Sequence, residues 1–251
     1  MFNVVVINGG RGAGSLIPSL LDNPSFNVTS IVNAYDDGKS TGEIRKFFGM
    51  LGPSDIRKVQ ELMLPQESPD YKSNLGIFQY RFPQSITNKN AHEIIDNFAT
   101  GNSDELCGYG FKSAHVIHEL RAYINTFLKT LFIIQKKNKC EFNFQDCSIM
   151  NCIYAGAFLK HERNIEIATL AIDKLFNLKG EVIPTSIENK KLVALRENGE
   201  MLYSEAEVVE LRSNVLIERI YLLDDFLEKS SFERLSIEDK RNYLEQHHCF
   251  V

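Results

Sequence analysis

The sequence contains no membrane-spanning segment and no metal-binding cysteine motif. Its apolar runs fall well short of the ~18 residues that a membrane helix needs, and it begins with a strand-like run in place of a signal peptide. Its five cysteines form no C-x-x-C pair, and an odd number of cysteines in a cytosolic protein indicates reduced thiols. These absences predict a soluble, cytoplasmic protein without a disulfide, a zinc site or a membrane partner.

The sequence also lacks an excess of positive charge, internal repeats and low-complexity linkers. The net charge of −5 argues against a broad nucleic-acid-binding surface. At 251 residues and 43% apolar content, we expect a single domain over residues 1–251. Within it, the apolar spacing predicts a helical segment over about 90–177 and a further buried strand over Val215–Leu223. A small β excursion over about 181–212 is expected around the hairpin turn Asn198-Gly199.

A glycine-rich turn follows the first predicted strand. Val4–Ile7 is a β-branched apolar run, typical of a buried parallel strand with helices on both faces. It stops at Asn8-Gly9-Gly10-Arg11-Gly12-Ala13-Gly14, and a helix is predicted over Ser15–Leu21. Free N–H groups at the start of such a helix suit an anion. The glycine spacing is neither G-x-G-x-x-G nor a Walker A motif, so a tight turn without a ligand is the alternative.

Charged and hydroxyl side chains gather after the second predicted strand, Val28–Val32. The loops that follow contain Asp36, Asp37, Ser40, Thr41, Arg45, Asp55 and Arg57. Loops beyond the carboxyl ends of parallel strands are where open α/β sheets bind ligands. Carboxylates beside arginines suit a site that holds a divalent metal ion and a diphosphate.

At these residues the chain resembles the 2-phospho-L-lactate transferase and gluconeogenesis factor family (CofD/YvcK-like). The resemblance rests on Gly-Gly-x-Gly after the first strand, Asn-x-x-Asp-Asp-Gly-x-Ser-x-Gly after the second, and Gly-x-x-Asp-Ile-Arg at residues 52–57. A second block agrees, with Ser148-Ile149-Met150-Asn151 opening a helix and Gly180-Glu181-Val182-Ile183-Pro184-Thr185 following it. The resemblance covers roughly residues 4–57 and 148–222.

The resemblance implies a Rossmann-like, mostly parallel α/β sheet flanked by helices that binds a nucleotide-diphosphate conjugate. In the transferase branch, magnesium assists the transfer of a phosphate-linked group from a GDP carrier to a deazaflavin acceptor. In the other branch, regulators bind a UDP-sugar and need catalyse nothing. The Asp-Asp-Gly-x-Ser-x-Gly loop is closer to the regulator branch, so the sequence leaves open whether the chain is an enzyme.

By resemblance, the predicted site residues form three groups. The nucleotide and phosphate contacts are Gly9, Gly10, Arg11, Gly12, Asn33, Asp37, Ser40, Thr41 and Asn151. The magnesium ligands are Asp36, Asp37 and Asp55. The catalytic residues are Asp55, Arg57 and Arg45, with the arginines offsetting charge on the leaving phosphate.

Several of these residues have simpler explanations. Asp55 could be the N-cap of a helix over Ile56–Leu64, and Asn151 could be a buried amide bonded to backbone. Arg11 stands where the family usually has threonine, and it could contact a diphosphate or extend into solvent. A NAD-dependent oxidoreductase is a weaker alternative because Asn33 occupies the place of the ribose-binding acid.

In the family a further strand delivers a second glycine loop, Gly-Pro-Gly-Ser, and no such motif occurs before Val251. Either the chain is a truncated form or fragment that lacks the family's C-terminal part, or it dispenses with this loop. We therefore expect weak nucleotide binding without transfer. We also expect an uncovered sheet edge or apolar face that could pair two chains into a homodimer.

Overall fold

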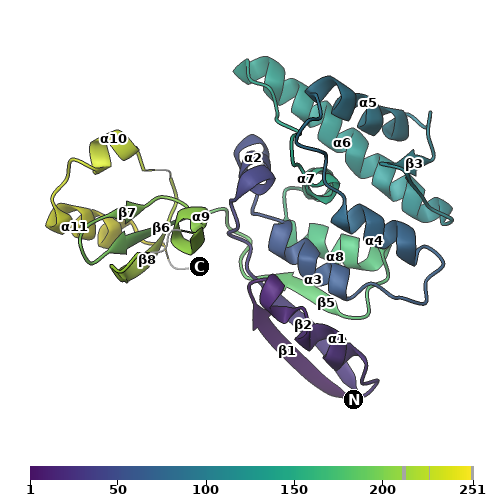
Figure 1. Ribbon diagram of the computed structural model, residues 1–251, viewed down its shortest axis with the longest axis horizontal. Coiled ribbons are helices and arrows are strands. Elements are labelled where there is room, and N and C mark those ends of the chain that lie inside the picture. The colour runs from purple at the N-terminus through teal and green to yellow at the C-terminus, as the bar shows by residue number, and fades with distance from the viewer. Residues whose placement is uncertain (211–212, 226, 250–251) are drawn as a thin grey trace. The chain divides into compact units, whose positions relative to one another are not determined.

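The computed structural model describes residues 1–210, 213–225 and 227–249. The side chains of four residues within these ranges lie outside the description: Arg11, Lys39, Ala206 and Glu210. Figure 1 labels the helices and strands that are named below.

The chain divides into two compact units. Unit 1 comprises Met1–Ala34 and Lys39–Ile187, and unit 2 comprises Tyr35–Gly38 and Glu188–Val251. This division differs from the single domain expected over residues 1–251. The expected β excursion over about 181–212 is wrong at its start, because residues 181–184 form a strand that pairs with the parallel sheet. The strands from Lys191 onward pair with one another and form a unit that continues to the C-terminal helix.

Unit 1 is built on a three-stranded parallel sheet in the order β1-β2-β5. The strands are β1 (Phe2–Asn8), β2 (Phe26–Val32) and β5 (Glu181–Pro184). β1 and β2 pair in register over their whole length. A parallel sheet flanked by helices confirms the predicted fold class.

Helices make up most of unit 1. They are α1 (Leu16–Leu21), α2 (Lys39–Phe48), α3 (Ser54–Leu62), α4 (Tyr71–Gln79), α5 (Asn88–Ala99), α6 (Ala114–Asn138), α7 (Ile149–Lys160) and α8 (Ile165–Leu175), with the 3-10 helix η1 (Arg11–Ala13) and the small hairpin β3 (Glu105–Leu106) and β4 (Tyr109–Gly110). The helical segment predicted over about 90–177 is confirmed by α5 to α8. None of the helices in the described ranges is both long and apolar enough to cross a bilayer.

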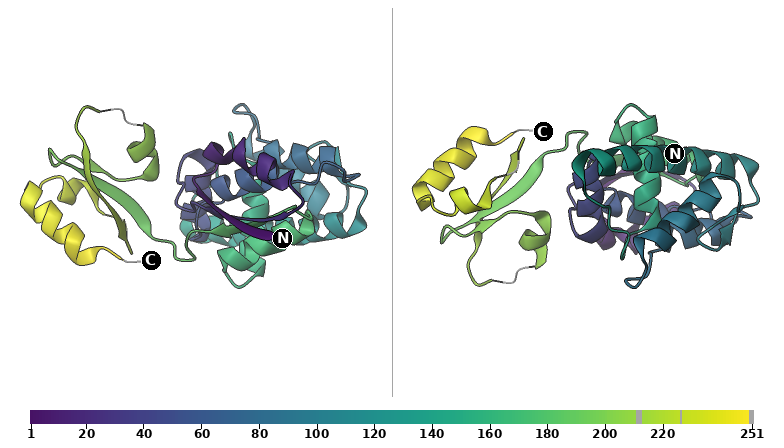
Figure 2. Two further views of the ribbon diagram at one scale, coloured as in Figure 1. Left: turned by 90° about the horizontal axis from the view of Figure 1, so that it is seen from below. Right: turned by 90° about the horizontal axis from the view of Figure 1, so that it is seen from above.

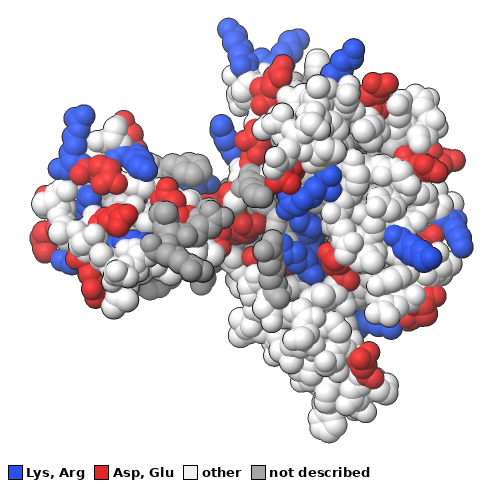
Figure 3. Space-filling view, in the orientation of Figure 1, with Lys and Arg blue, Asp and Glu red and all other residues white. Residues whose placement is uncertain are grey.

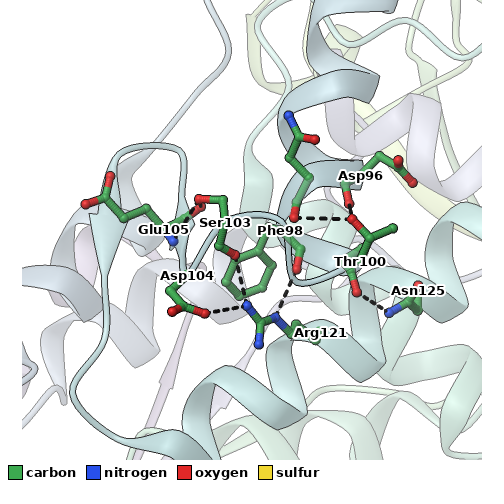
Figure 4. A network of polar contacts seen from close by, with 10 residues as sticks. Asp96, Phe98, Thr100, Ser103, Asp104, Glu105, Arg121 and Asn125 are labelled. Atoms are coloured by element: carbon green, nitrogen blue, oxygen red, sulfur yellow. Dashed lines mark hydrogen bonds and ion pairs between the residues drawn. The ribbon is translucent and has the colours of Figure 1, made fainter.

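The core of unit 1 centres on α7, in which every residue from Ile149 to Phe158 is buried. At Gly156 an added Cβ would lie 1.9 Å from the backbone O of Tyr123 in α6, so the two helix backbones touch. Arg121 of α6 donates hydrogen bonds to the backbone O of Phe98 at 3.0 Å and of Ser103 at 2.9 Å, which ties α6 to the end of α5 (Figure 4). The close approach at Gly156 thus places α7, whose first turn carries Asn151, directly against α6.

β1 is not the buried strand that the sequence predicts. It lies at the edge of the sheet, at the surface of unit 1 in both Figure 1 and the left view of Figure 2. Val5 is 58% exposed and Ile7 is 77% exposed, whereas Val6 between them is buried. A run of β-branched residues favours a strand whether or not helices cover it. The sequence therefore predicted the strand correctly and its burial wrongly.

Unit 2 contains an antiparallel sheet in the order β7-β6-β8. Its elements are β6 (Lys191–Arg196), β7 (Met201–Leu202), α9 (Glu205–Glu210), β8 (Ile217–Leu223), α10 (Lys229–Phe232) and α11 (Ile237–His247). The predicted hairpin is confirmed, because Leu195 pairs with Met201 around a turn in which Gly199 has a φ of +83°. The expected buried strand over Val215–Leu223 is wrong in its burial: β8 pairs antiparallel with β6 and exposes residues 218–220.

Candidate functional site

The side chain of Asn8 organises the glycine turn at the end of β1. Its Oδ1 accepts a hydrogen bond from Gly10 N at 2.9 Å, and its Nδ2 donates to Ser30 Oγ of β2 at 2.6 Å. Gly10 has a φ of +94°, in the left-handed region that favours glycine. The turn therefore has a defined backbone path at the carboxyl end of the sheet, where α/β proteins bind ligands.

Asp55 lies in the first turn of α3, directly against Gly10. A Cβ on Gly10 would lie 2.7 Å from Asp55 Oδ1, so a larger residue does not fit there. Asp55 Oδ1 accepts a hydrogen bond from Lys58 Nζ at 2.8 Å, and Oδ2 accepts one from Asn33 Nδ2 at 3.4 Å. The N-cap of α3 is Pro53, and α3 has no side-chain cap hydrogen bond. The capping explanation of Asp55 is therefore wrong.

A cavity of about 380 Å³ opens beside this turn. It is lined by Gly10, Gly14, Arg57, Lys58, Glu61, Leu62, Gln79 and Arg81. Three cationic side chains line it against one carboxylate, and that carboxylate, Glu61, accepts a hydrogen bond from Gln79 Nε2 at 2.6 Å. Figure 3 shows Lys and Arg side chains gathered near the middle of this face of unit 1. The cavity is therefore suited to an anionic group. We call it the cationic cavity.

The guanidinium group of Arg57 is held in place within this wall. Arg57 is buried, and its Nη1 donates a hydrogen bond to the backbone O of Phe78 at 2.7 Å. Arg45, the other predicted catalytic arginine, is buried on α2 and does not line the cationic cavity. The structure thus places one of the two predicted arginines at the cavity.

The hydroxyl residues of the second motif lie in the first turn of α2, a helix that the sequence did not predict. Ser40 Oγ accepts a hydrogen bond from Asn151 Nδ2 of α7 at 3.2 Å, and the hydroxyl of Thr41 contacts that of Ser54. Asn151 is fully buried, and among the described residues its Oδ1 and the Oγ of Ser148 have no hydrogen-bond partner. The Asn151 amide is therefore bonded to a hydroxyl and not to backbone.

A second cavity of about 440 Å³ has a different chemical character. It is lined by Ser40, Glu43, Gln84, Asn143, Gln145 and Asp146. The two cavities are neighbours, because Arg81 of the cationic cavity donates a hydrogen bond from Nη1 to the backbone O of Asp146 at 2.6 Å. We call this second space the amide cavity.

Asp36 and Asp37 belong to unit 2, whereas Asp55 belongs to unit 1. Asp36 Oδ1 accepts a hydrogen bond from Gly38 N at 3.3 Å, and Asp37 Oδ2 accepts one from Glu205 N at 3.3 Å. Within the described ranges, no three His, Cys, Asp or Glu side chains lie close enough together to hold a metal ion. The set of three carboxylate ligands stays a prediction.

A buried polar network joins α3 to the helices α7 and α8 behind it. Gln60 Nε2 donates to Asp173 Oδ1 of α8 at 2.5 Å, and Tyr154 of α7 donates its hydroxyl to Gln60 Oε1 at 2.6 Å. Burial raises the pKa of Asp173 to about 7, against the hydrogen bond from Val182 N that favours the charged form. The network joins α3, α7 and α8 under the residues that face the cationic cavity.

Sequence reasoning found part of this site. Gly9 and Gly12 lie in the turn with nothing within 4 Å of an added Cβ, and the side chain of Arg11 lies outside the described residues. Lys58 and Arg81 were missed. Lys58 could have been found, because it follows Asp55 by three residues and so shares its helix face. Arg81 had no such signal.

Comparison with known proteins shows the family. The family model described as 2-phospho-L-lactate transferase CofD matches residues 4–230. A protein of Aquifex aeolicus named "Putative gluconeogenesis factor" is 28% identical over 211 residues, covering 83% of this chain and 45% of that protein. A protein of the same name from a Nostoc strain is 38% identical over 101 residues, covering 40% of this chain and 21% of that protein.

A solved structure shows that the fold is shared. The crystal structure of a UPF0052 family member from Bacillus halodurans has a TM-score of 0.56 and 20% sequence identity, and the match covers 93% of this chain and 55% of that one. The chain thus spans about half the length of these relatives, or less. Because the family model covers most of the chain, this protein belongs to the family described as 2-phospho-L-lactate transferase CofD.

Proposed function

We propose that unit 1 binds a nucleoside diphosphate conjugate with the two phosphates in the cationic cavity. One observation carries this proposal: Arg57, Lys58 and Arg81 line a cavity that opens at the glycine turn after a parallel strand. Guanidinium groups bind phosphate oxygens bidentately, and a lysine adds a compact charge. Arg57 is held by the backbone of Phe78, so little side-chain entropy is lost when it binds.

Magnesium fits this proposal as a partner of Asp55. Mg²⁺ in nucleotide sites typically takes one or two carboxylates together with phosphate oxygens and water. The Asp55 carboxylate lies against Gly10 and forms an ion pair with the ammonium of Lys58. A carboxylate in this position can also bind a metal ion at the glycine turn. A bound ion would neutralise phosphate charge, while Asp55 would hold it and Lys58 would turn to the ligand.

The reaction that we propose is the transfer of a phosphate-linked group from the conjugate to an acceptor. Family membership supports it, because the matching family is described as a transferase. The amide cavity offers a neighbouring space for an acceptor, and the hydrogen bond from Arg81 to Asp146 links the walls of the two cavities. Such a transfer needs positioning and charge stabilisation by groups such as Arg57, and no covalent nucleophile.

A second candidate function is the binding of a UDP-sugar by a regulator that catalyses no reaction. The names of the curated relatives favour it, because those from Aquifex aeolicus and Nostoc are both gluconeogenesis factors by name. Both candidates require the same diphosphate contacts and differ in whether the bound conjugate is consumed.

A thermal-shift screen of GDP- and UDP-linked compounds, with and without magnesium, tests the proposed binding. A ligand at 100 times its dissociation constant adds about 2.7 kcal/mol to the free energy of unfolding, which a melting curve resolves. We expect Lys58→Ala to reduce the shift, and Lys136→Ala on the exposed end of α6 to leave it unchanged. A folded protein that shows no shift with any of these compounds at millimolar concentration would refute the proposal.

Product analysis separates the two candidates. Under the transferase proposal, incubation of the stabilising conjugate with a deazaflavin acceptor and magnesium should release the nucleoside monophosphate. Under the regulator proposal, the conjugate should be recovered intact. Because the binding screen comes first, a protein without ligand binding is distinguished from one that binds without turnover.

A further inference from the structure

We propose that Glu61 binds the ribose of the nucleoside, by accepting hydrogen bonds from its 2′- and 3′-hydroxyl groups, and makes the site prefer ribonucleotides to deoxyribonucleotides. The inference rests on the proposed function, because it requires a nucleoside diphosphate with its phosphates in the cationic cavity. It goes further by assigning one side chain of that cavity to the nucleoside.

Glu61 is the one carboxylate among the described residues that line the cationic cavity. The other charged side chains there are those of Arg57, Lys58 and Arg81. A carboxylate at contact distance from phosphate oxygens repels them, and the repulsion grows where water is partly excluded. The phosphates therefore belong beside the three cations, and Glu61 is left to contact an uncharged part of the ligand.

The order of these residues along α3 separates the two ends of the cavity. α3 begins beside the glycine turn, where Asp55 lies against Gly10. Arg57 and Lys58 follow, and Glu61 lies on their face of the helix one turn, or about 5 Å, farther along the axis. A ligand that places its phosphates at Arg57 and Lys58 thus extends its next group, the ribose, toward Glu61.

The carboxylate of Glu61 is oriented and still has acceptor capacity. Glu61 is half-buried, and its Oε1 accepts a hydrogen bond from Gln79 Nε2 of α4 at 2.6 Å. Its Oε2 has no hydrogen-bond partner in the described part of the chain, and the nearby ammonium of Lys58 is paired with Asp55. Because an ionised carboxylate offers about four acceptor positions, Glu61 can accept from two adjacent hydroxyl groups.

An acidic side chain is the usual partner of a ribose hydroxyl in Rossmann-like sites. It commonly follows the second strand, and here that place is occupied by Asn33, whose Nδ2 donates to Asp55 Oδ2. Glu61 supplies a carboxylate from α3 instead. Hydrogen bonds from hydroxyl groups to a carboxylate are charge-assisted and roughly twice as strong as those between neutral groups.

The preference for ribose follows from the loss of one such bond. A hydrogen bond to a charged group changes affinity by about 10- to 100-fold. A 2′-deoxy or 3′-deoxy nucleotide leaves one acceptor position of Glu61 without its donor. Each should therefore bind at least about tenfold more weakly than the ribonucleotide.

Titration calorimetry measures this preference in the unaltered chain with magnesium present. The ligands are GDP, UDP, their 2′-deoxy and 3′-deoxy analogues, and inorganic pyrophosphate. The dissociation constants of the deoxy analogues should be at least about tenfold those of GDP and UDP. Pyrophosphate contains no ribose, so its binding reports on the phosphate site alone.

Glu61→Gln keeps the size of the side chain and removes its charge. The ratio of deoxy to ribo dissociation constants should fall toward one, whereas pyrophosphate should bind equally well or more tightly because a negative charge leaves the cavity. Gln79→Ala removes the donor that orients the carboxylate and should lower the same ratio. Glu93→Gln is the matched control, since Glu93 is an exposed glutamate on α5 that does not line the cavity. It should leave the ratio unchanged.

The outcomes separate this inference from the proposed function. If pyrophosphate and the nucleotides bind without a ribose preference, or with one that Glu61→Gln leaves unchanged, the role of Glu61 is overturned and the phosphate site stands. A lower melting temperature of Glu61→Gln with an unchanged ratio would show that Glu61 only joins α3 to α4. A folded chain that binds neither pyrophosphate nor any of the nucleotides overturns both proposals.

Discussion

Lys58 Nζ lies 2.8 Å from Asp55 Oδ1, so an ammonium group faces the carboxylate that was predicted to bind magnesium. The pair sits one helical turn apart on α3, against the glycine turn. A metal ion and Lys58 would compete for the same oxygen. The contribution of magnesium to ligand binding should therefore depend on this pair.

Asp55→Asn should abolish the part of ligand binding that depends on magnesium. Asparagine keeps the size and one acceptor oxygen but loses the charge that a hard cation requires. The thermal shift produced by the conjugate should become equal with and without magnesium. Asp104→Asn is the control, because Asp104 is an exposed carboxylate between α5 and β3 that does not line the cationic cavity. A magnesium response equal to that of the unaltered protein would show that Asp55 is not a ligand.

Gly10→Ala should destabilise the protein by about 1–3 kcal/mol and weaken ligand binding. The substitution places a Cβ 2.7 Å from Asp55 Oδ1 at a φ of +94°, so it combines a clash with backbone strain. Gly12→Ala is the matched control in the same turn, since nothing lies within 4 Å of its added Cβ. Urea unfolding of both variants measures the difference. Equal stability would mean that the turn relaxes freely around Gly10.

Asp173 should make the protein less stable as the pH rises from about 4 to about 7. Burial raises its pKa from 3.8 to about 7, so in this range the folded chain holds a proton that the unfolded chain has lost. The free energy of unfolding falls with pH wherever the folded state binds more protons, and the loss is complete above the folded pKa. The expected size is on the order of 2–4 kcal/mol.

Asp173→Asn should remove this fall, because the amide does not titrate. It keeps an acceptor oxygen for Gln60, although it cannot offer a second one to Val182 N. Urea unfolding at a series of pH values measures how the free energy of unfolding changes with pH for the variant and for the unaltered protein. If the variant and the unaltered protein lost stability in parallel, the pH dependence would come from other groups.

Gly156→Ala should destabilise unit 1 by about 1–3 kcal/mol or more. Its Cβ would lie 1.9 Å from Tyr123 O, and backbone atoms in a packed core move only at a cost. Thermal unfolding measures the effect. A change below about 0.5 kcal/mol would mean that α6 and α7 can separate without loss.

The sequence predicted the features that local chemistry determines. The Asn198-Gly199 hairpin, the glycine turn and the long apolar period of α6 each depend on residues close together in the chain. The contact between Asn151 and Ser40 joins residues 111 apart, and only the family resemblance had placed both at one site.

The features that the sequence did not predict depend on tertiary contacts, which local sequence patterns do not indicate. α2 begins at Lys39, inside a motif whose flanking Gly38 and Gly42 indicate a loop. The exposure of Val5 depends on what covers β1, and valine has the same strand preference in either case. Arg81 reaches the cationic cavity because the chain returns there after α4, which composition does not reveal.

The assignment of Tyr35–Gly38 to unit 2 has a consequence for synthesis. The Tyr35 hydroxyl donates to Glu188 O across 153 residues, and Asp37 accepts from Glu205 N across 168. At about 5–20 residues per second, a ribosome adds that length of chain in roughly 8–30 seconds. Nearly all of unit 1 emerges within that interval, so unit 2 can be completed only after its neighbour has had time to fold.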